Sequence, residues 1–175
     1  LYAAMSWQPE IDELQHRRTL AEACGGPDAV ARHHAQGKLT IRERIARLAD
    51  AGSFREVGKL AGKGKYDTDG KLMDFEPAPY VMGLARIDNR PVAIGGEDYT
   101  IRAGTGFGSD RRKGGQGGFI EDLAYEYRIP LVNLIDGTGG SVNTAKRKGY
   151  TVVPGYGQDG AERAVDLLGL VPVVS

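Results

Sequence analysis

The sequence has a single cysteine, Cys24, and no excess of charge of either sign. One cysteine excludes a disulfide framework and a zinc site built from several cysteines, and it suits a reducing compartment. The 23 basic and 23 acidic residues cancel, so no whole-chain field attracts nucleic acid or an anionic membrane. No apolar run reaches the length of a membrane span, and no secretory leader is visible. We therefore expect a cytoplasmic protein that binds neither nucleic acid nor membrane.

Glycine, by contrast, is abundant. The chain has 26 glycines, about twice the usual share of roughly 7%. They gather in two stretches, residues 95–118 and 137–160. Because glycine lacks a Cβ, its backbone can adopt positive φ and bring peptide N–H groups close to a ligand. This clustering predicts two functional loops rather than a flexible linker.

The most informative stretch is residues 131–141. A short apolar run ends at Asp136 and passes directly into a turn, Gly137-Thr138-Gly139-Gly140-Ser141. We expect a buried strand whose carboxyl end opens into backbone donors for a phosphate or an oxyanion. Ligands of open α/β sheets favour that position. On these residues alone, a tight turn without a function is an equal alternative.

The amino-terminal residues 10–50 have helical patterns throughout. Gly25-Gly26-Pro27 ends one helix and starts the next at a favoured first-turn proline. Thr40-Ile41-Arg42-Glu43 matches the capping-box pattern of a third helix. Arg42, Arg44 and Arg47 of this third helix are expected on a solvated face, and phosphate binding is the less favoured alternative.

Beyond residue 51 the pattern changes to strands. Residues 54–57 form a short one, and residues 80–87 and 91–95 flank a predicted hairpin turn. Residues 59–74 are rich in Gly, Lys and Asp, and we expect a mobile loop there.

The last third alternates between helix and strand. Helices are expected at residues 117–127 and 161–168, and strands at 130–135 and 171–174. Alternation of this kind predicts parallel strands with right-handed crossovers, and hence an α/β fold. The chain ends inside an apolar strand, so we expect a fold that is incomplete at the carboxy end.

Few side chains in this sequence suit acid-base or metal chemistry. The adjacent His33 and His34 point about 100° apart on a helix, which makes a poor metal pair, and we expect them at the polar end of the second helix. Asp98 and Asp136 could act as general bases, but ordering a turn through backbone N–H groups is the favoured alternative. Tyr99 is expected to be a packing residue.

Five segments, in this order, resemble a known family. They are residues 37–45 (GKLTIRERI), 50–56 (DAGSFRE), 83–90, 97–100 (EDYT) and 136–140 (DGTGG). Together they resemble the carboxyltransferase (beta) subunits of biotin-dependent acyl-CoA carboxylases, of the propionyl-CoA, methylcrotonyl-CoA and acetyl-CoA carboxylase type. The resemblance covers residues 25–175.

The resemblance implies a fold, a partner set and a reaction. Residues 1–50 would be a helical amino-terminal arm, and residues 51–175 the acyl-CoA-binding half of a crotonase/ClpP-like ββα spiral. Biotin would be carried on a separate carrier domain or subunit, and no metal is implied. The active site would be completed by the carboxy-terminal half of a neighbouring protomer in a homo-oligomer. In a eukaryote, the mitochondrial matrix would be the expected compartment.

The resemblance also implies a catalytic role for the glycine turn at residues 137–141. Gly139 and Gly140 would donate their peptide N–H groups to the enolate formed from the acyl-CoA thioester. Family members usually have a shorter Asp-x-Gly-Gly turn, so Thr138 is the alternative to Gly140.

Two further segments would bind the substrate. Gly104, Thr105 and Gly106 would line the thioester pocket, although Ala103-Gly104-Thr105-Gly106 stands where Gly-Gly-Ser is common in the family. The cluster Arg111-Arg112-Lys113 would meet the CoA phosphates, and a solvated charge run is its structural alternative.

Other functions remain open. An acyl-CoA decarboxylase would use the same enolate-stabilising turn, whereas a hydratase would need a pair of glutamates, and none stands near residues 137–141. A third alternative is a non-catalytic assembly module in which the glycine loops only shape an interface.

Overall fold

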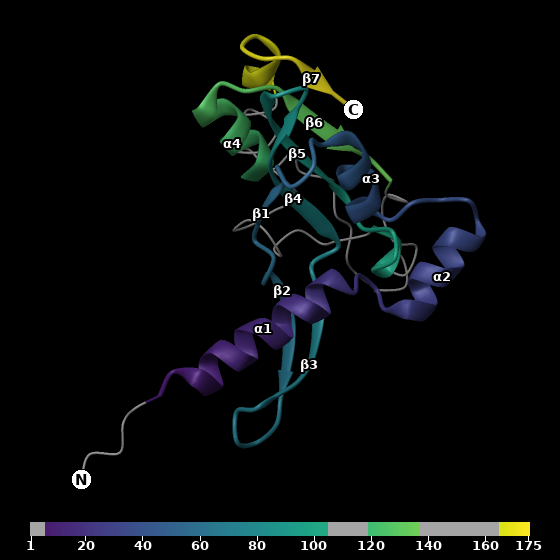
Figure 1. The fold of residues 1–175 in the computed structure, drawn as a ribbon, viewed down its shortest axis with the longest axis vertical. Coiled ribbons are helices and arrows are strands. Elements are labelled where there is room, and N and C mark those ends of the chain that lie inside the picture. The colour runs from purple at the N-terminus through teal and green to yellow at the C-terminus, as the bar shows by residue number, and fades with distance from the viewer. Residues whose placement is uncertain (1–5, 105–118, 137–164) are drawn as a thin grey trace, which may run out of the picture.

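A computed structural model describes residues 6–104, 119–136 and 165–175 of the chain (Figure 1). The described helices and strands are, in chain order, α1 (Gln8–Glu22), α2 (Pro27–Ala35), α3 (Ile41–Leu48), β1 (Arg55–Val57), β2 (Gly62–Tyr66), β3 (Leu72–Pro77), β4 (Tyr80–Ile87), β5 (Arg90–Glu97), the 3-10 turn η1 (Arg102–Gly104), α4 (Phe119–Tyr127), β6 (Leu131–Leu134) and β7 (Val173–Val174). The chain is therefore mixed α/β. Residues 165–168 are also helical.

The main sheet has five strands in the order β1-β4-β5-β6-β7. Strands β1, β4 and β5 pair antiparallel, while β6 runs parallel to β5 and β7 parallel to β6. The parallel pairs confirm what the helix-strand alternation predicts. The predicted hairpin is confirmed as well, because Asp88 and Asn89 between β4 and β5 both have left-handed backbones, with φ of 49° and 62°, as a tight hairpin turn requires.

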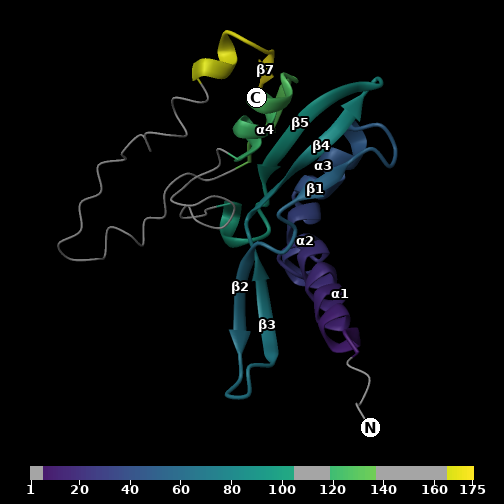
Figure 2. The same ribbon diagram turned by 90° about the vertical axis from the view of Figure 1, so that its left-hand side faces the viewer.

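Helices cover both faces of this sheet, with α3 on one side and α4 on the other (Figure 2). The strands alternate accordingly. In β5, Val92 and Ile94 pack with Ile41 and Ile45 of α3, whereas the intervening Ala93 packs on the α4 side. This period of two is the pattern of a strand with a core on each face.

The predicted helix boundaries of the amino-terminal region are confirmed. Gly26 precedes α2 with φ of 88°, and Pro27 occupies the first turn. At α3 the Thr40 hydroxyl accepts from the Glu43 N–H, and the Glu43 carboxylate accepts from the Thr40 N–H. Both halves of the capping box are therefore present.

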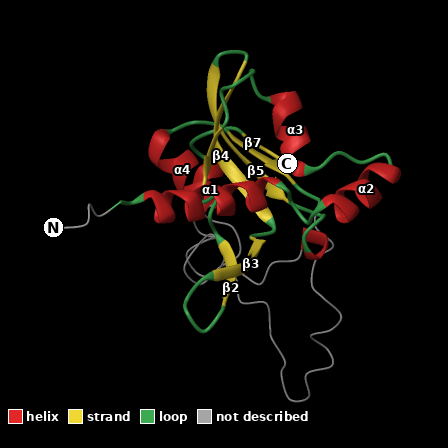
Figure 3. Cartoon of the chain, turned by 60° about the horizontal axis from the view of Figure 1, so that its bottom comes forward, coloured by secondary structure: helices red, strands yellow, loops and turns green. Residues whose placement is uncertain are grey.

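The prediction of a mobile loop at residues 59–74 is wrong. Strands β2 and β3 form an antiparallel two-stranded sheet, which extends away from the main sheet (Figures 1 and 3) and contacts α1. The carboxylate of Asp67 closes the turn by accepting from the N–H groups of Asp69 and Lys71, at 3.0 and 2.8 Å. An Asx-type turn of this kind fixes the register of a hairpin. Strand β2, of sequence GKGKY, is exposed along its whole length, which is why its composition resembles that of a loop.

The expectation of a solvated face for the α3 arginines is wrong for Arg42. Its guanidinium makes two hydrogen bonds to the Glu56 carboxylate, at 2.8 and 3.0 Å, and a third to the Ala21 carbonyl at 3.1 Å. The Glu56 side chain is only 5% exposed. The bidentate pair with Glu56 joins α3 to β1, and the bond to Ala21 joins α3 to the end of α1. These contacts fix the helices on the sheet.

Neutralising this carboxylate should therefore destabilise the protein. We expect Glu56→Gln to lower the free energy of unfolding by about 2 kcal/mol, because a half-buried guanidinium loses a charged acceptor. Urea denaturation followed by circular dichroism measures the change. The control is Asp74→Asn, which breaks the exposed Lys65–Asp74 pair on the β2–β3 hairpin and should change stability little. Equal effects of the two variants would contradict the assignment.

Candidate functional site

The predicted site begins where two parallel strands end side by side. Gly95 of β5 pairs with Asn133 of β6, and Gly96 pairs with Leu134. Strand β5 ends at the polar residue Glu97, and Asp136 lies two residues beyond the last residue of β6. The carboxyl ends of parallel strands are the usual place for a ligand in an α/β sheet.

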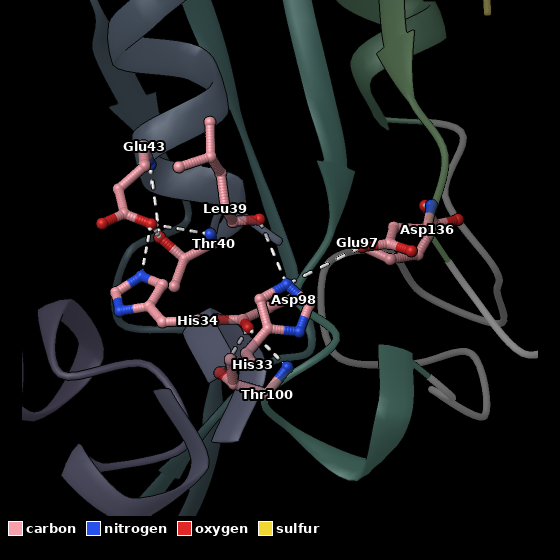
Figure 4. Close-up of polar contacts among 9 residues, drawn as sticks. All are labelled: His33, His34, Leu39, Thr40, Glu43, Glu97, Asp98, Thr100 and Asp136. Carbon is pink, nitrogen blue, oxygen red and sulfur yellow. Dashed lines mark hydrogen bonds and ion pairs between the residues drawn. The ribbon is translucent and has the colours of Figure 1, made fainter. Parts of the chain in front are cut away.

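Polar side chains join these two strand ends (Figure 4). The backbone N–H of Asp136 donates to Glu97 Oε2 at 3.0 Å. The backbone of Asp136, the last described residue before the predicted glycine turn, is therefore held from the neighbouring strand. We call His33, Glu97, Asp98, Tyr99 and Asp136 the strand-end cluster.

Asp98 orders the turn that follows β5. Its side chain is buried, at 1% exposure, and its carboxylate accepts from both the N–H and the hydroxyl of Thr100. The Thr100 hydroxyl oxygen in turn accepts from the Gly25 N–H at 2.9 Å. These contacts confirm the prediction that Asp98 shapes a turn, and they dock the junction between α1 and α2 against the end of β5.

The nearby thiol is not suited to nucleophilic chemistry. Burial, and then the charge of Asp98, raise the pKa of Cys24 to about 12. The thiol therefore stays protonated at neutral pH, and a thiolate is the form that reacts.

His33 joins this cluster from α2, where the sequence predicts only a polar helix end. His33 is 4% exposed. Its Nε2 lies 3.1 Å from the Leu39 carbonyl oxygen and 3.9 Å from Asp136 Oδ2. Its ring stacks on Tyr99, with centroids 5.5 Å apart and planes at 26°. No periodicity in the sequence could signal this placement, because it depends on how the chain turns back after α2.

Tyr99 packs as predicted, with a cation on its ring. The Lys38 ammonium lies 4.6 Å from the Tyr99 ring centroid. A cation in that position favours the negative face of the ring. Tyr99 therefore links His33 to the segment between α2 and α3.

The neighbouring His34 faces away from the cluster and bonds to Glu43 at 2.9 Å. Among the residues that the structure describes, no three His, Cys, Asp or Glu side chains are grouped to hold a metal ion. In the same part of the chain, no helix is both long and apolar enough to cross a membrane.

The His34–Glu43 contact predicts an acid-dependent stability. Hydrogen bonds from His34 and from the Thr40 N–H lower the pKa of Glu43 to about 2. A lowered folded-state pKa gives stability that is complete above the ordinary glutamate pKa of about 4.3 and is lost as the pH falls toward 2. We therefore expect Glu43→Gln, which keeps a capping-box side chain, to lose less stability than the wild type between about pH 5 and pH 2.

Urea midpoints measured across that pH range test this prediction. His34→Gln removes the largest cause of the shift, so its acid dependence should lie between those of the wild type and Glu43→Gln. Parallel curves for all three proteins would contradict the prediction.

A cavity of about 360 Å³ adjoins the cluster on the other side of Thr100. It lies between the α1–α2 junction, β3 and η1, and its lining includes Cys24, Phe75, Ile101 and Arg102. The Arg102 guanidinium is 3.3 Å from the Glu76 carboxylate. The cavity therefore has both apolar and charged walls.

Of the residues predicted to bind substrate or stabilise the enolate, the structure describes Gly104. It ends η1 with φ of 70°, and its N–H donates to the Ile101 carbonyl at 3.0 Å. The preceding Ala103 is also left-handed, with φ of 53°, a conformation that favours glycine. The other predicted residues lie outside the described part of the chain: Thr105, Gly106, Arg111, Arg112, Lys113, Thr138, Gly139 and Gly140.

The known proteins that this chain is similar to include subunits of acyl-CoA carboxylases and of a related decarboxylase. The chain is 32% identical to the propionyl-CoA carboxylase beta chain of Cereibacter sphaeroides, over 94% of this chain and 31% of that protein. It is 27% identical to the methylmalonyl-CoA decarboxylase subunit alpha of Veillonella parvula, over 96% and 31%. The chain thus spans about a third of the length of these curated relatives. No protein-family model matches it.

Solved structures agree. A single-chain, multi-domain long-chain acyl-CoA carboxylase superposes with a TM-score of 0.67 and 30% identity, over 94% of this chain and 16% of that one. The structural neighbours are carboxyltransferases of the crotonase-like fold. The resemblance predicted from the five sequence segments is therefore confirmed.

Proposed function

We propose, from this confirmed resemblance to the carboxyltransferase subunits of biotin-dependent acyl-CoA carboxylases, that the chain carries the acyl-CoA side of a carboxyl-transfer site. The observation that carries the proposal is the meeting of two parallel strand ends at Asp136, the residue that opens the glycine turn. The ββα spiral, the helical arm of residues 1–50 and the acyl-CoA-binding domain of residues 51–175 belong to the same proposal.

The chemistry of the cluster fits this role. Asp98 is committed to Thr100 and Glu97 to the backbone of Asp136, so these two carboxylates order the backbone rather than act as free bases. A site of this kind can stabilise charge but needs a base from elsewhere. Carboxybiotin, when bound, supplies the carboxyl group and the atom that accepts the α-proton.

The chain's own contribution is to hold the thioester and its developing negative charge. In the proposal, the N–H groups of Gly139 and Gly140, or of Thr138 in the alternative register, donate to the thioester oxygen. One such donor contributes on the order of 3 kcal/mol to the transition state. Gly104, Thr105 and Gly106 line the acyl pocket.

The partners follow from the same proposal. They are an acyl-CoA, a biotin carboxylase with its biotin carrier, and a neighbouring protomer whose carboxy-terminal half completes the site. The proposed compartment is the cytoplasm, or the mitochondrial matrix in a eukaryote.

Two measurements on the complete protein test the function. Calorimetry should show binding of propionyl-CoA, and the protein should transfer the carboxyl group of methylmalonyl-CoA to free biotin. Absence of binding would favour a non-catalytic assembly module. Binding without any transfer to biotin would remove the carboxyltransferase assignment and leave a CoA-binding protein.

The cation cluster Arg111-Arg112-Lys113 gives a prediction that can be tested independently of the glycine turn. If Arg111 and Arg112 meet the CoA phosphates, replacing both with alanine should raise the KM for the acyl-CoA about tenfold, with kcat little changed, because the phosphates are equally bound before and during the reaction. Steady-state kinetics measures both constants. Arg44→Ala with Arg47→Ala, two α3 cations removed together, is the charge-matched control and should leave KM unchanged. An unchanged KM in the first pair would support a solvated charge run.

A decarboxylase is the second candidate, because one relative is named as a methylmalonyl-CoA decarboxylase subunit. The same enolate-stabilising turn serves loss of a carboxyl group as well as its transfer. Incubation with methylmalonyl-CoA in the absence of biotin distinguishes the two, since a decarboxylase active without biotin would release propionyl-CoA and a carboxyltransferase would not.

A further inference from the structure

His33 is the one buried histidine of the strand-end cluster, and it comes from a helix distant in sequence from both glycine loops. A carbonyl oxygen only accepts hydrogen bonds, so the 3.1 Å contact between His33 Nε2 and the Leu39 carbonyl requires a hydrogen on Nε2. The contact thereby fixes the tautomer of the ring. The hydrogen-bearing nitrogen is also the one that faces Asp136 (Figure 4).

The contact with Asp136 is electrostatic. At 3.9 Å, Nε2 and Oδ2 are too far apart for a direct hydrogen bond. The His33 side chain is only 3% exposed, however, and the Asp136 side chain 28% exposed, so water screens the attraction between the N–H and the carboxylate only in part. Glu97 holds the Asp136 backbone from β5, and His33 attracts its side chain from α2, so both ends of the residue are restrained.

The orientation of the imidazole is itself fixed. Its ring stacks on Tyr99, and Lys38 contacts that tyrosine ring. Within the described part of the chain, the buried Nδ1 has no hydrogen-bond partner. A buried acceptor without a partner reduces stability. A role as a stabilising core residue therefore explains His33 poorly, and the contact of its Nε2 with Asp136 explains it better.

We infer that His33 is a positioning residue for carboxyl transfer, which holds Asp136 and so fixes the start of the glycine turn. The inference rests on the proposed function of that turn. Oxyanion donors work only when they are held close to the position of the developing charge. A displacement of about 1 Å can reduce the rate about a hundredfold. Loss of His33 should therefore lower kcat with little effect on substrate binding.

Three variants of the complete protein test this. His33→Phe keeps a ring against Tyr99 but removes the N–H, and kcat for transfer from methylmalonyl-CoA to biotin should fall about 10- to 100-fold with KM within about threefold. His33→Gln restores a donor near the position of Nε2 and should recover most of the rate. His34→Gln, one residue further along α2, is the matched control and should keep the wild-type rate.

A second readout does not depend on activity. Hydrogen-deuterium exchange of the Asp136 N–H, which bonds to Glu97, should become about tenfold faster in His33→Phe and stay unchanged in His34→Gln. If the wild type transfers no carboxyl group but exchange responds in this way, the proposed function fails and the restraint by His33 stands. If the wild type is active and His33→Phe changes neither kcat nor exchange, the inference about His33 is overturned.

Should His33→Phe fail to fold, His33→Asn combined with Asp136→Asn decides the matter, because the shorter asparagine side chain places no donor at the position of Nε2. If the histidine acts through Asp136, the effects of the two single substitutions on kcat should not add in the double variant. Additive effects would overturn the inference.

Discussion

In a Gly139→Val variant of the complete protein, carboxyl transfer from methylmalonyl-CoA to biotin is expected to fall by a factor on the order of 100 to 1,000. Valine keeps the peptide N–H, but its branched Cβ restricts the backbone and occupies the space through which the thioester oxygen would approach. Gly139 lies three residues after Asp136, whose backbone N–H is held by Glu97. The loss should therefore be in kcat, because the interaction strengthens as the enolate forms.

Gly169→Val is the matched control for this substitution. Among the residues that the structure describes, a Cβ at Gly169 would meet only the Asp166 carbonyl oxygen, at 3.9 Å, so valine there has room and should leave the rate unchanged. Activity of Gly139→Val within twofold of the wild type would exclude the oxyanion assignment. Loss of acyl-CoA binding together with kcat would indicate that the turn shapes the pocket rather than the transition state.

A large effect on stability is expected at Gly96 of β5, which pairs with Leu134 of β6. A Cβ at this position would lie 2.3 Å from the Leu134 carbonyl oxygen, 2.6 Å from Ile41 Cδ1 and 2.9 Å from the Leu134 Cβ. Gly96→Ala should therefore lower the free energy of unfolding by about 3 kcal/mol or more, because a backbone oxygen cannot move aside as a flexible side chain can. Urea denaturation measures this loss.

Gly169→Ala serves as the control for the glycine-to-alanine change, and its stability should differ little from that of the wild type. If Gly96→Ala and Gly169→Ala have equal free energies of unfolding, β5 and β6 can move apart enough to accept a methyl group, and the prediction is wrong. The prediction also bears on the site, since the same two strands bring Glu97 to Asp136. Where Gly96→Ala still folds, its carboxyl-transfer rate should fall as well.

Local signals were sufficient for much of the fold. The capping box at Thr40 and Glu43, the proline after Gly26 and the left-handed pair Asp88-Asn89 each act within a few residues. Interactions of such short range are visible in the sequence because the partners are always the same distance apart. The alternation that predicts parallel strands is of the same kind, since it reflects one helix and one strand at a time.

The errors of prediction share one physical cause. Strand β2 is exposed along its whole length because the hairpin extends from the molecule, and the side-chain turn at Asp67 fixes the register of the hairpin. Arg42 looks like a surface cation until Glu56 is placed beside it by β1. In each case the deciding partner is set by the path of the chain rather than by the local pattern.

The residue order alone supplies the resemblance to acyl-CoA carboxyltransferases and the prediction of a glycine turn that follows a strand and Asp136. Both depend on residue types in a fixed order, which the sequence contains. The side chains that contact Asp136 become visible only in the folded chain, because Glu97 arrives from β5 and His33 from α2. Such partners meet through the pairing of β5 with β6 and the docking of Gly25 on Thr100, and contacts between segments 39 to 103 residues apart leave no periodic trace in the sequence.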